Sequence, residues 1–325
     1  MSNKEAPPNN ANLLPLGQIQ PETGSPLEIY KKAEIFIRGD DLLGWRQLLK
    51  QIRPPISKAL MDWRSKNGKI HFKSMEQFYN TADEAINVAA PLFMMALAGI
   101  ESGKDKFKDQ RSLLDDLLSI LGWNYSGLVL LADLPEALGF VYQGLHGAVC
   151  MKSEQPDLAI ALADMKVPIR RTTELAPVWR QPGLIGWPAS LGESCRNSWE
   201  FIYNGFRRWE WLKEIFEEEM KYHKALVAYY MALNITDLAE HASCSPEKIF
   251  HSEDISLIRV PLGFLKEDKE VHQGALAMLI RNPDFLRMLW GRWGISEEKM
   301  KYNWSEWLKL CFSWLRNVYS VQNGT

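Results

Sequence analysis

Apolar residues recur at helical spacing along most of this 325-residue chain, and the alternating runs typical of a half-buried strand are few. The clearest case is the span 75–97, where one helical face collects Ala82, Ile86, Ala89, Phe93 and Leu97. The pattern predicts an all-α protein of two packed helical lobes.

Proline marks several expected helix starts. Pro54 and Pro55 follow Arg53, and proline is best tolerated in the first turn of a helix. Pro246 after Ser245 repeats the arrangement. We therefore expect a helix to begin near Pro54.

Composition shifts at two places along the chain. Residues 1–26 hold five prolines among Asn, Gln and Ser, which predicts a disordered tail. Residues 167–192 combine Pro168, Pro177, Pro182 and Pro188 with three glycines, and such a segment cannot sustain a helix or a central strand. We expect a boundary there, between an N-terminal lobe at 27–166 and a tryptophan-rich C-terminal lobe at 193–325.

The longest helical pattern runs from Ser198 to Leu233. One continuous helix of this length would measure roughly 54 Å, although Gly205 is expected to weaken or bend it. Trp209 falls on its apolar stripe, and Trp211, two residues on, would point roughly 200° away. We therefore expect Trp211 to leave that core and meet the other lobe or a partner chain.

The chain contains thirteen tryptophans, which suit both large helical cores and the centres of interfaces. Trp304, Trp307 and Trp314 stripe one face of a C-terminal helical pattern. A core stripe is the simpler interpretation, and a partner-binding face is the alternative.

Two sixteen-residue apolar stretches, 85–100 and 117–132, are shorter than the roughly 20 residues that a membrane-spanning helix needs. Buried helices are therefore expected in place of a membrane anchor. The N-terminus has no basic region followed by an apolar one, as a secretory signal would. Four widely spaced cysteines fit reduced thiols, so we expect a cytoplasmic protein.

Three short constellations hint at chemistry. The span 236–250 resembles the pattern of a helix-turn-helix, but its turn lacks glycine and its second helix offers Glu247 and Lys248 where base-reading Arg or Asn is usual. An ordinary helical corner is the alternative. His241, Cys244, His251 and His272 lack the paired spacing of a zinc site.

His146 and Cys150 share a helix face, since they lie four residues apart. A histidine can activate a nearby thiol, but the small apolar neighbours favour tight packing around a buried cysteine. The sequence contains no phosphate loop, nucleophile elbow or zinc-protease motif. We expect no catalytic residue, cofactor or metal.

Basic residues gather locally although the formal net charge is only −2. Eight cations against two acids give an excess of six between residues 46 and 76, interleaved with Trp45, Trp63 and Phe72. The candidate binding residues are Arg46, Lys50, Arg53, Lys58, Arg64, Lys66, Lys69 and Lys73, with Arg170, Arg171 and Trp211 added. Such a region suits an acidic partner or a phosphate backbone, and a plain solvated helix face is the simplest alternative.

These observations favour a non-catalytic interaction, scaffold or regulatory subunit of a larger cytosolic assembly with a protein partner. A nucleic-acid-binding protein using residues 46–76 or the corner at 236–250 is the second reading. The third is an enzyme with a site at the lobe junction, where Arg170 and Arg171 would hold an anion.

Overall fold

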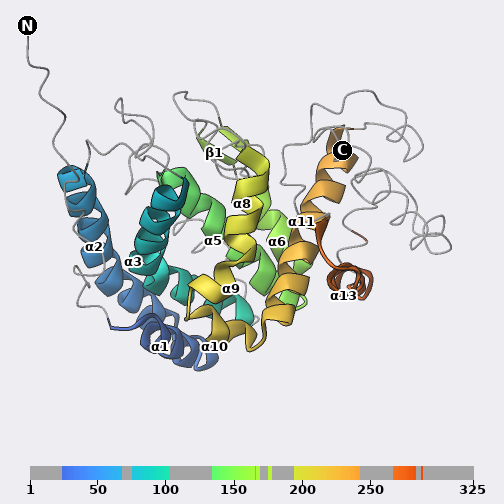
Figure 1. Ribbon diagram of the computed structural model, residues 1–325. Coiled ribbons are helices and arrows are strands. Elements are labelled where there is room, and N and C mark those ends of the chain that lie inside the picture. Colours follow the sequence, from blue (N-terminus) through green and yellow to red (C-terminus); the bar gives the residue numbers. More distant parts are fainter. Residues whose placement is uncertain are drawn as a thin grey trace, which may run out of the picture.

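The computed structural model describes residues 24–67, 75–102, 134–164, 166–168, 175–177, 194–241, 266–282 and 287. The expected all-α fold is confirmed, because nearly every described element is a helix packed on other helices (Figure 1). The helices are α1 (Pro26–Arg38), α2 (Leu42–Asn67), α3 (Met75–Glu101), α5 (Leu134–Lys152), α6 (Pro156–Ala163), α8 (Ser194–Tyr203), α9 (Gly205–Arg208), α10 (Leu212–Phe216), α11 (Glu219–His241) and α13 (Lys269–Ile280).

A capping box opens α1. The Ser25 hydroxyl accepts the backbone N–H of Glu28, and the Glu28 carboxylate accepts the backbone N–H of Ser25 at 2.9 Å. Pro26 occupies the first turn, where its missing N–H costs nothing. The helix thus begins inside the predicted tail 1–26, of which residues 1–23 lie outside the described part and stay a prediction.

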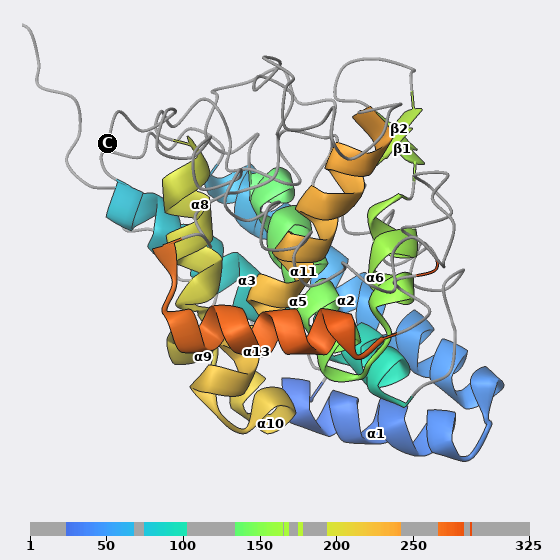
Figure 2. The ribbon, with the colours of Figure 1, turned by 90° about the vertical axis from the view of Figure 1, so that its right-hand side faces the viewer.

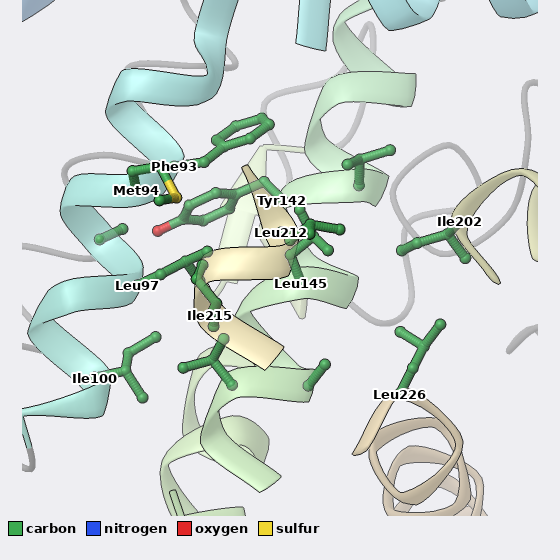
Figure 3. Close-up of a cluster of buried hydrophobic side chains, with 14 of the residues drawn as sticks. Phe93, Met94, Leu97, Ile100, Tyr142, Leu145, Ile202, Leu212, Ile215 and Leu226 are labelled. Atoms are coloured by element: carbon green, nitrogen blue, oxygen red, sulfur yellow. The ribbon is translucent and has the colours of Figure 1, made fainter. Parts of the chain in front are cut away.

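The core lies around α5, which packs on both α3 and α11. The predicted face of α3 is confirmed, since Ala82, Ile86, Ala89, Phe93 and Leu97 are all buried. Tyr142 and Leu145 of α5 point toward Phe93, Met94 and Leu97 of α3, and Leu212 and Ile215 of α10 close the cluster (Figure 3). Burying a side chain of this size contributes about 1.5–3 kcal/mol, so this cluster anchors the fold.

Helices from both sides of the expected boundary at 167–192 share this one hydrophobic cluster. α11 packs on α5 and α6, and α10 lies against α11. The division into two lobes itself stays a prediction.

The sequence pattern did not predict the two short strands that the structure contains. β1 (Lys166–Pro168) pairs antiparallel with β2 (Leu175–Pro177), with Val167 opposite Ala176. A two-stranded ladder has only edges, so proline is tolerated in it.

The expectation of a helix start at Pro54 is wrong. Pro54 and Pro55 lie inside the single helix α2, between the buried residues Ile52 and Ile56. Packing of these isoleucines against the core carries the helix through two prolines that local preference would place at its beginning.

The expectation of one helix from 198 to 233 is also wrong. The backbone breaks at Asn204, next to the glycine expected to weaken the helix, then at Trp209, which is extended at φ −114° and ψ 97°. A third break follows α10, where Glu217 has φ 61°. Four shorter helices, α8 to α11, replace the single long helix.

α13 crosses the outside of α11 (Figure 2). The Trp199 indole of α8 donates to the Glu267 carboxylate at 2.7 Å, just before α13 begins. Lys224 of α11 pairs with Glu270 at 2.8 Å, and the Asn282 amide donates to the Glu154 carbonyl at 2.7 Å. Polar contacts therefore hold both ends of α13.

Within the described ranges, one stretch, Tyr79–Glu101 of α3, is long and apolar enough to cross a membrane. The core of the protein buries 83% of its most apolar window. Residues 85–100 thus form a buried helix, as the sequence predicts. The second apolar stretch, 117–132, lies outside the described residues.

Candidate interaction surface

An apolar ridge runs along the outward side of α2. Leu43 is 67% exposed and Met61 is 56% exposed, and Pro54 between them is also exposed. At 100° per residue, these three positions fall within about 20° of one line along the helix. They therefore form a single solvent-facing ridge.

One cation interrupts this ridge and two flank it. Lys50 lies almost on the ridge line, and Arg46 and Lys58 lie about 60° to either side of it. All three side chains are exposed. Together with Leu43, Pro54 and Met61 they define what we call the α2 outer face.

The inward side of α2 is fully committed to the core. Trp45 is only 1% exposed, and Ile52, Ile56 and Leu60 are buried with it against α1 and α3. The tryptophan that the sequence interleaved with the cations thus belongs to the core, as the simplest alternative expected. It offers no ring for stacking on a base.

The two prolines alter the hydrogen bonding of the outer face. Because proline has no N–H, the carbonyls of Lys50 and Gln51 receive no amide hydrogen from positions 54 and 55. The Ser57 hydroxyl donates to the Arg53 carbonyl at 2.9 Å. The prolines thus remove two backbone hydrogen bonds from the middle of α2.

The structure places some of the other predicted binding residues. Arg53 is half-buried on α2. Arg64 and Lys66 belong to α2, but their side chains lie outside the description, as do the residues Lys69, Lys73, Arg170 and Arg171. The ridge residues Leu43 and Met61 were not among the predicted binding residues, although their spacing on a helical wheel aligns them with Lys50.

The expectation that Trp211 turns away from the core of Trp209 is wrong. Trp211 is only 8% exposed, and its ring stacks on that of Trp209 with centroids 6.1 Å apart and planes 12° apart. The 200° separation assumed a continuous helix, and the extended backbone at Trp209 removes that assumption. Trp211 does reach the N-terminal half, where it meets Phe93 and donates to Asn87 of α3 at 3.3 Å.

Beside these rings, Asp83 of α3 gathers three donors. Its Oδ2 accepts Nε of Arg208 at 2.9 Å and a second guanidinium N–H at 2.5 Å, and its Oδ1 accepts the Trp209 indole N–H at 3.0 Å. The guanidinium also lies over the Phe201 ring at 4.7 Å. This group, the Asp83 cluster, ties α8, α9 and the turn before α10 to α3 and leaves Arg208 engaged inside the fold.

His146 and Cys150 share a face of α5 as the spacing predicts, with the thiol sulfur 3.7 Å from Nδ1. Both side chains are buried, and burial lowers the pKa of His146 to about 3. A neutral imidazole supplies no positive charge to favour a thiolate. This geometry supports the packing interpretation of the pair.

The other two constellations fall largely outside the description. α11 ends at His241, so most of the corner at 236–250, with Cys244 and His251, is not described. His272 is buried on α13. In the part of the chain that the structure describes, no three His, Cys, Asp or Glu side chains gather as metal ligands would.

Comparison of the chain with protein-family models, curated proteins and solved structures finds no match. The α2 outer face is therefore the feature of the described residues that bears most directly on function.

Proposed function

We propose that this protein is a non-catalytic interaction subunit, a scaffold or regulator within a cytosolic assembly, that binds a protein partner through the α2 outer face. One observation supports it above the others. The inward side of α2 is buried in the core, and its outward side exposes to solvent an apolar ridge with cations along it.

The distribution of exposed apolar side chains supports the same proposal. Single exposed apolar residues are ordinary on a protein surface, but groups of them mark interaction sites. Among described residues, the large apolar side chains exposed to solvent are Ile35, Leu43, Met61, Met220 and Ile280. The three most exposed of these belong to α1 and α2, so these two helices have the most apolar surface to bury against a partner.

Nucleic acid binding is the second proposal, and it relies on the same cations. A phosphate backbone is followed by cations, with aromatic rings on which bases stack. The burial of Trp45 removes the one aromatic of this region whose side chain is described. The enzyme hypothesis rests on Arg170 and Arg171, outside the described residues, and stays a prediction.

Site-specific photo-cross-linking in the cells that make the protein tests the first proposal. Benzoylphenylalanine replaces Leu43 or Met61 in two full-length variants, and Ile280 or Met220 in two controls with the same kind of side chain elsewhere on the surface. We expect one protein to be captured from both α2 positions and from neither control.

Capture of nucleic acid from Leu43 and Met61 would replace the proposal by its alternative. Equal capture of the same protein from all four positions, or no adduct from the α2 positions, would refute it.

A further inference from the structure

We infer that the occupant of the α2 outer face is an acidic, amphipathic α-helix of the partner. This inference rests on the proposed function and adds to it the chemistry and the shape of the bound segment. The charge, the length and the kind of ridge on α2 each contribute one step.

Charge selects an acidic segment. Arg46, Lys50 and Lys58 are exposed along the face, and Asp62 is the exposed acid on the same helix. Two more exposed acids, Asp40 and Asp41, precede the helix, and the Asp41 carboxylate accepts the Gly44 N–H. Unlike charges placed across an interface steer association and fix its register. A second copy of this chain would bring the same cations to the contact and be repelled, so a homodimer through this face is disfavoured.

Length and spacing select a helix. Leu43 and Met61 are 18 residues apart, which is about 27 Å along α2. The ridge residues are separated by 11 and 7 positions, both close to whole numbers of helical turns. An amphipathic helix presents its own anchors at the same periodicity, and α2 offers no strand edge on which an extended peptide could pair.

The apolar ridge separates this occupant from a phosphate backbone. Leu43, Pro54 and Met61 lie along one line, with Lys50 on that line between Leu43 and Pro54. A nucleic acid would place charged or polar groups against these three apolar residues. A helix with leucines along its centre and carboxylates at its edges covers the ridge and meets the cations at once. Both parts of the face are then used.

A defined peptide tests the inference on the purified full-length protein. The probe is a fluorescein-labelled helical peptide of about 21 residues, long enough to cover the ridge, with leucines on one face and glutamates beside them. One control peptide carries lysine in place of glutamate, and a second has the same composition in scrambled order. Binding is measured by fluorescence anisotropy.

We expect saturable binding of the acidic amphipathic peptide alone. The charge variant Lys50→Glu/Lys58→Glu and the ridge variant Leu43→Ser/Met61→Ser should each weaken it by about tenfold or more. The matched variants Lys213→Glu/Lys221→Glu and Met220→Ser/Ile280→Ser should leave it within about twofold. Circular dichroism confirms that each variant is folded.

Several results would overturn the inference: no saturation by the acidic peptide, equal affinity for the lysine or scrambled peptide, or equal weakening by the matched variants. Duplex DNA of the same length serves as a further probe. If DNA binds and the acidic peptide does not, and Lys50→Glu/Lys58→Glu abolishes DNA binding, the helical occupant is refuted while the face remains a binding surface. The cross-linking experiment decides the proposed function separately.

Discussion

Replacing Asp83 by alanine should detach the α8 to α10 segment from α3 more than any other single polar substitution in this region. Asp83 accepts the indole N–H of Trp209 and two N–H groups of Arg208. The alanine variant removes all three hydrogen bonds and leaves the two donor side chains, Arg208 and Trp209, in place. The substitution therefore leaves the Trp209 indole and the Arg208 guanidinium without their acceptor, in a place where the fold limits their contact with water.

The magnitude follows from how far each donor is withdrawn. Trp209 is fully buried, and leaving a buried N–H unsatisfied costs about 1–3 kcal/mol. The Arg208 and Asp83 side chains are 27% and 20% exposed, so water screens their ion pair and its loss adds only about 1 kcal/mol. The expected fall in the free energy of unfolding is about 2–4 kcal/mol.

Urea unfolding, followed by tryptophan fluorescence and far-UV circular dichroism, measures this loss. Asn87→Ala is the matched control, because Asn87 lies one turn along α3 and accepts an indole N–H from Trp211, but is exposed. It should cost less than about 1 kcal/mol, since water can replace the lost acceptor. Asp83→Asn should fall between the two, because it keeps an acceptor for Trp209 without the charge.

An Asp83→Ala variant as stable as Asn87→Ala would refute the reasoning. The Asp83 cluster would then be a consequence of the packing of Trp209 and Trp211, and the extended backbone at Trp209 would need another cause.

Two further predictions concern buried polar groups on α5 and α11. Burial lowers the pKa of His146 to about 3, below its ordinary 6.5. Between pH 6.5 and pH 3 the unfolded chain therefore binds a proton at this histidine that the folded protein does not. Stability falls as the pH drops through that range. His146→Leu should therefore reduce the loss of unfolding free energy between pH 7 and pH 5 by about 2 kcal/mol, and an unchanged pH profile in urea titrations would contradict this. The Tyr222 hydroxyl donates to the Ile202 carbonyl at 2.5 Å, whereas the buried Tyr230 hydroxyl has no hydrogen-bond partner among the described residues. Tyr222→Phe should lower the free energy of unfolding by about 1 kcal/mol and Tyr230→Phe should leave it unchanged or raise it, and equal losses in the two variants would argue against the assignment.

Sequence periodicity was sufficient for the helical class and for much of the core. The apolar face of α3 is buried because five residues at helical spacing can only be withdrawn from water together. The pairing of His146 with Cys150 follows from a four-residue interval for the same local reason.

Prediction from sequence failed where a local preference competed with packing. Proline prefers the start of a helix, but Pro54 lies inside α2 because the buried Ile52 and Ile56 flank it on the same helix. On one continuous helix Trp209 would lie on the apolar stripe and Trp211 would point away from it, but the backbone extends at Trp209, whose indole N–H meets Asp83 of α3. The partner in that contact is more than a hundred residues away in the chain, so no local pattern could indicate it.

The candidate surface divides in the same way. Its cations, Arg46, Lys50 and Lys58, were evident as a local charge excess in the sequence. Its ridge was not, because an apolar residue on a helix faces solvent only if no other element covers it, and the packing of α2 on α1 and α3 decided which side stays open. Helical periodicity determines which residues share a face, and only the contacts between distant segments determine which face remains exposed to a partner.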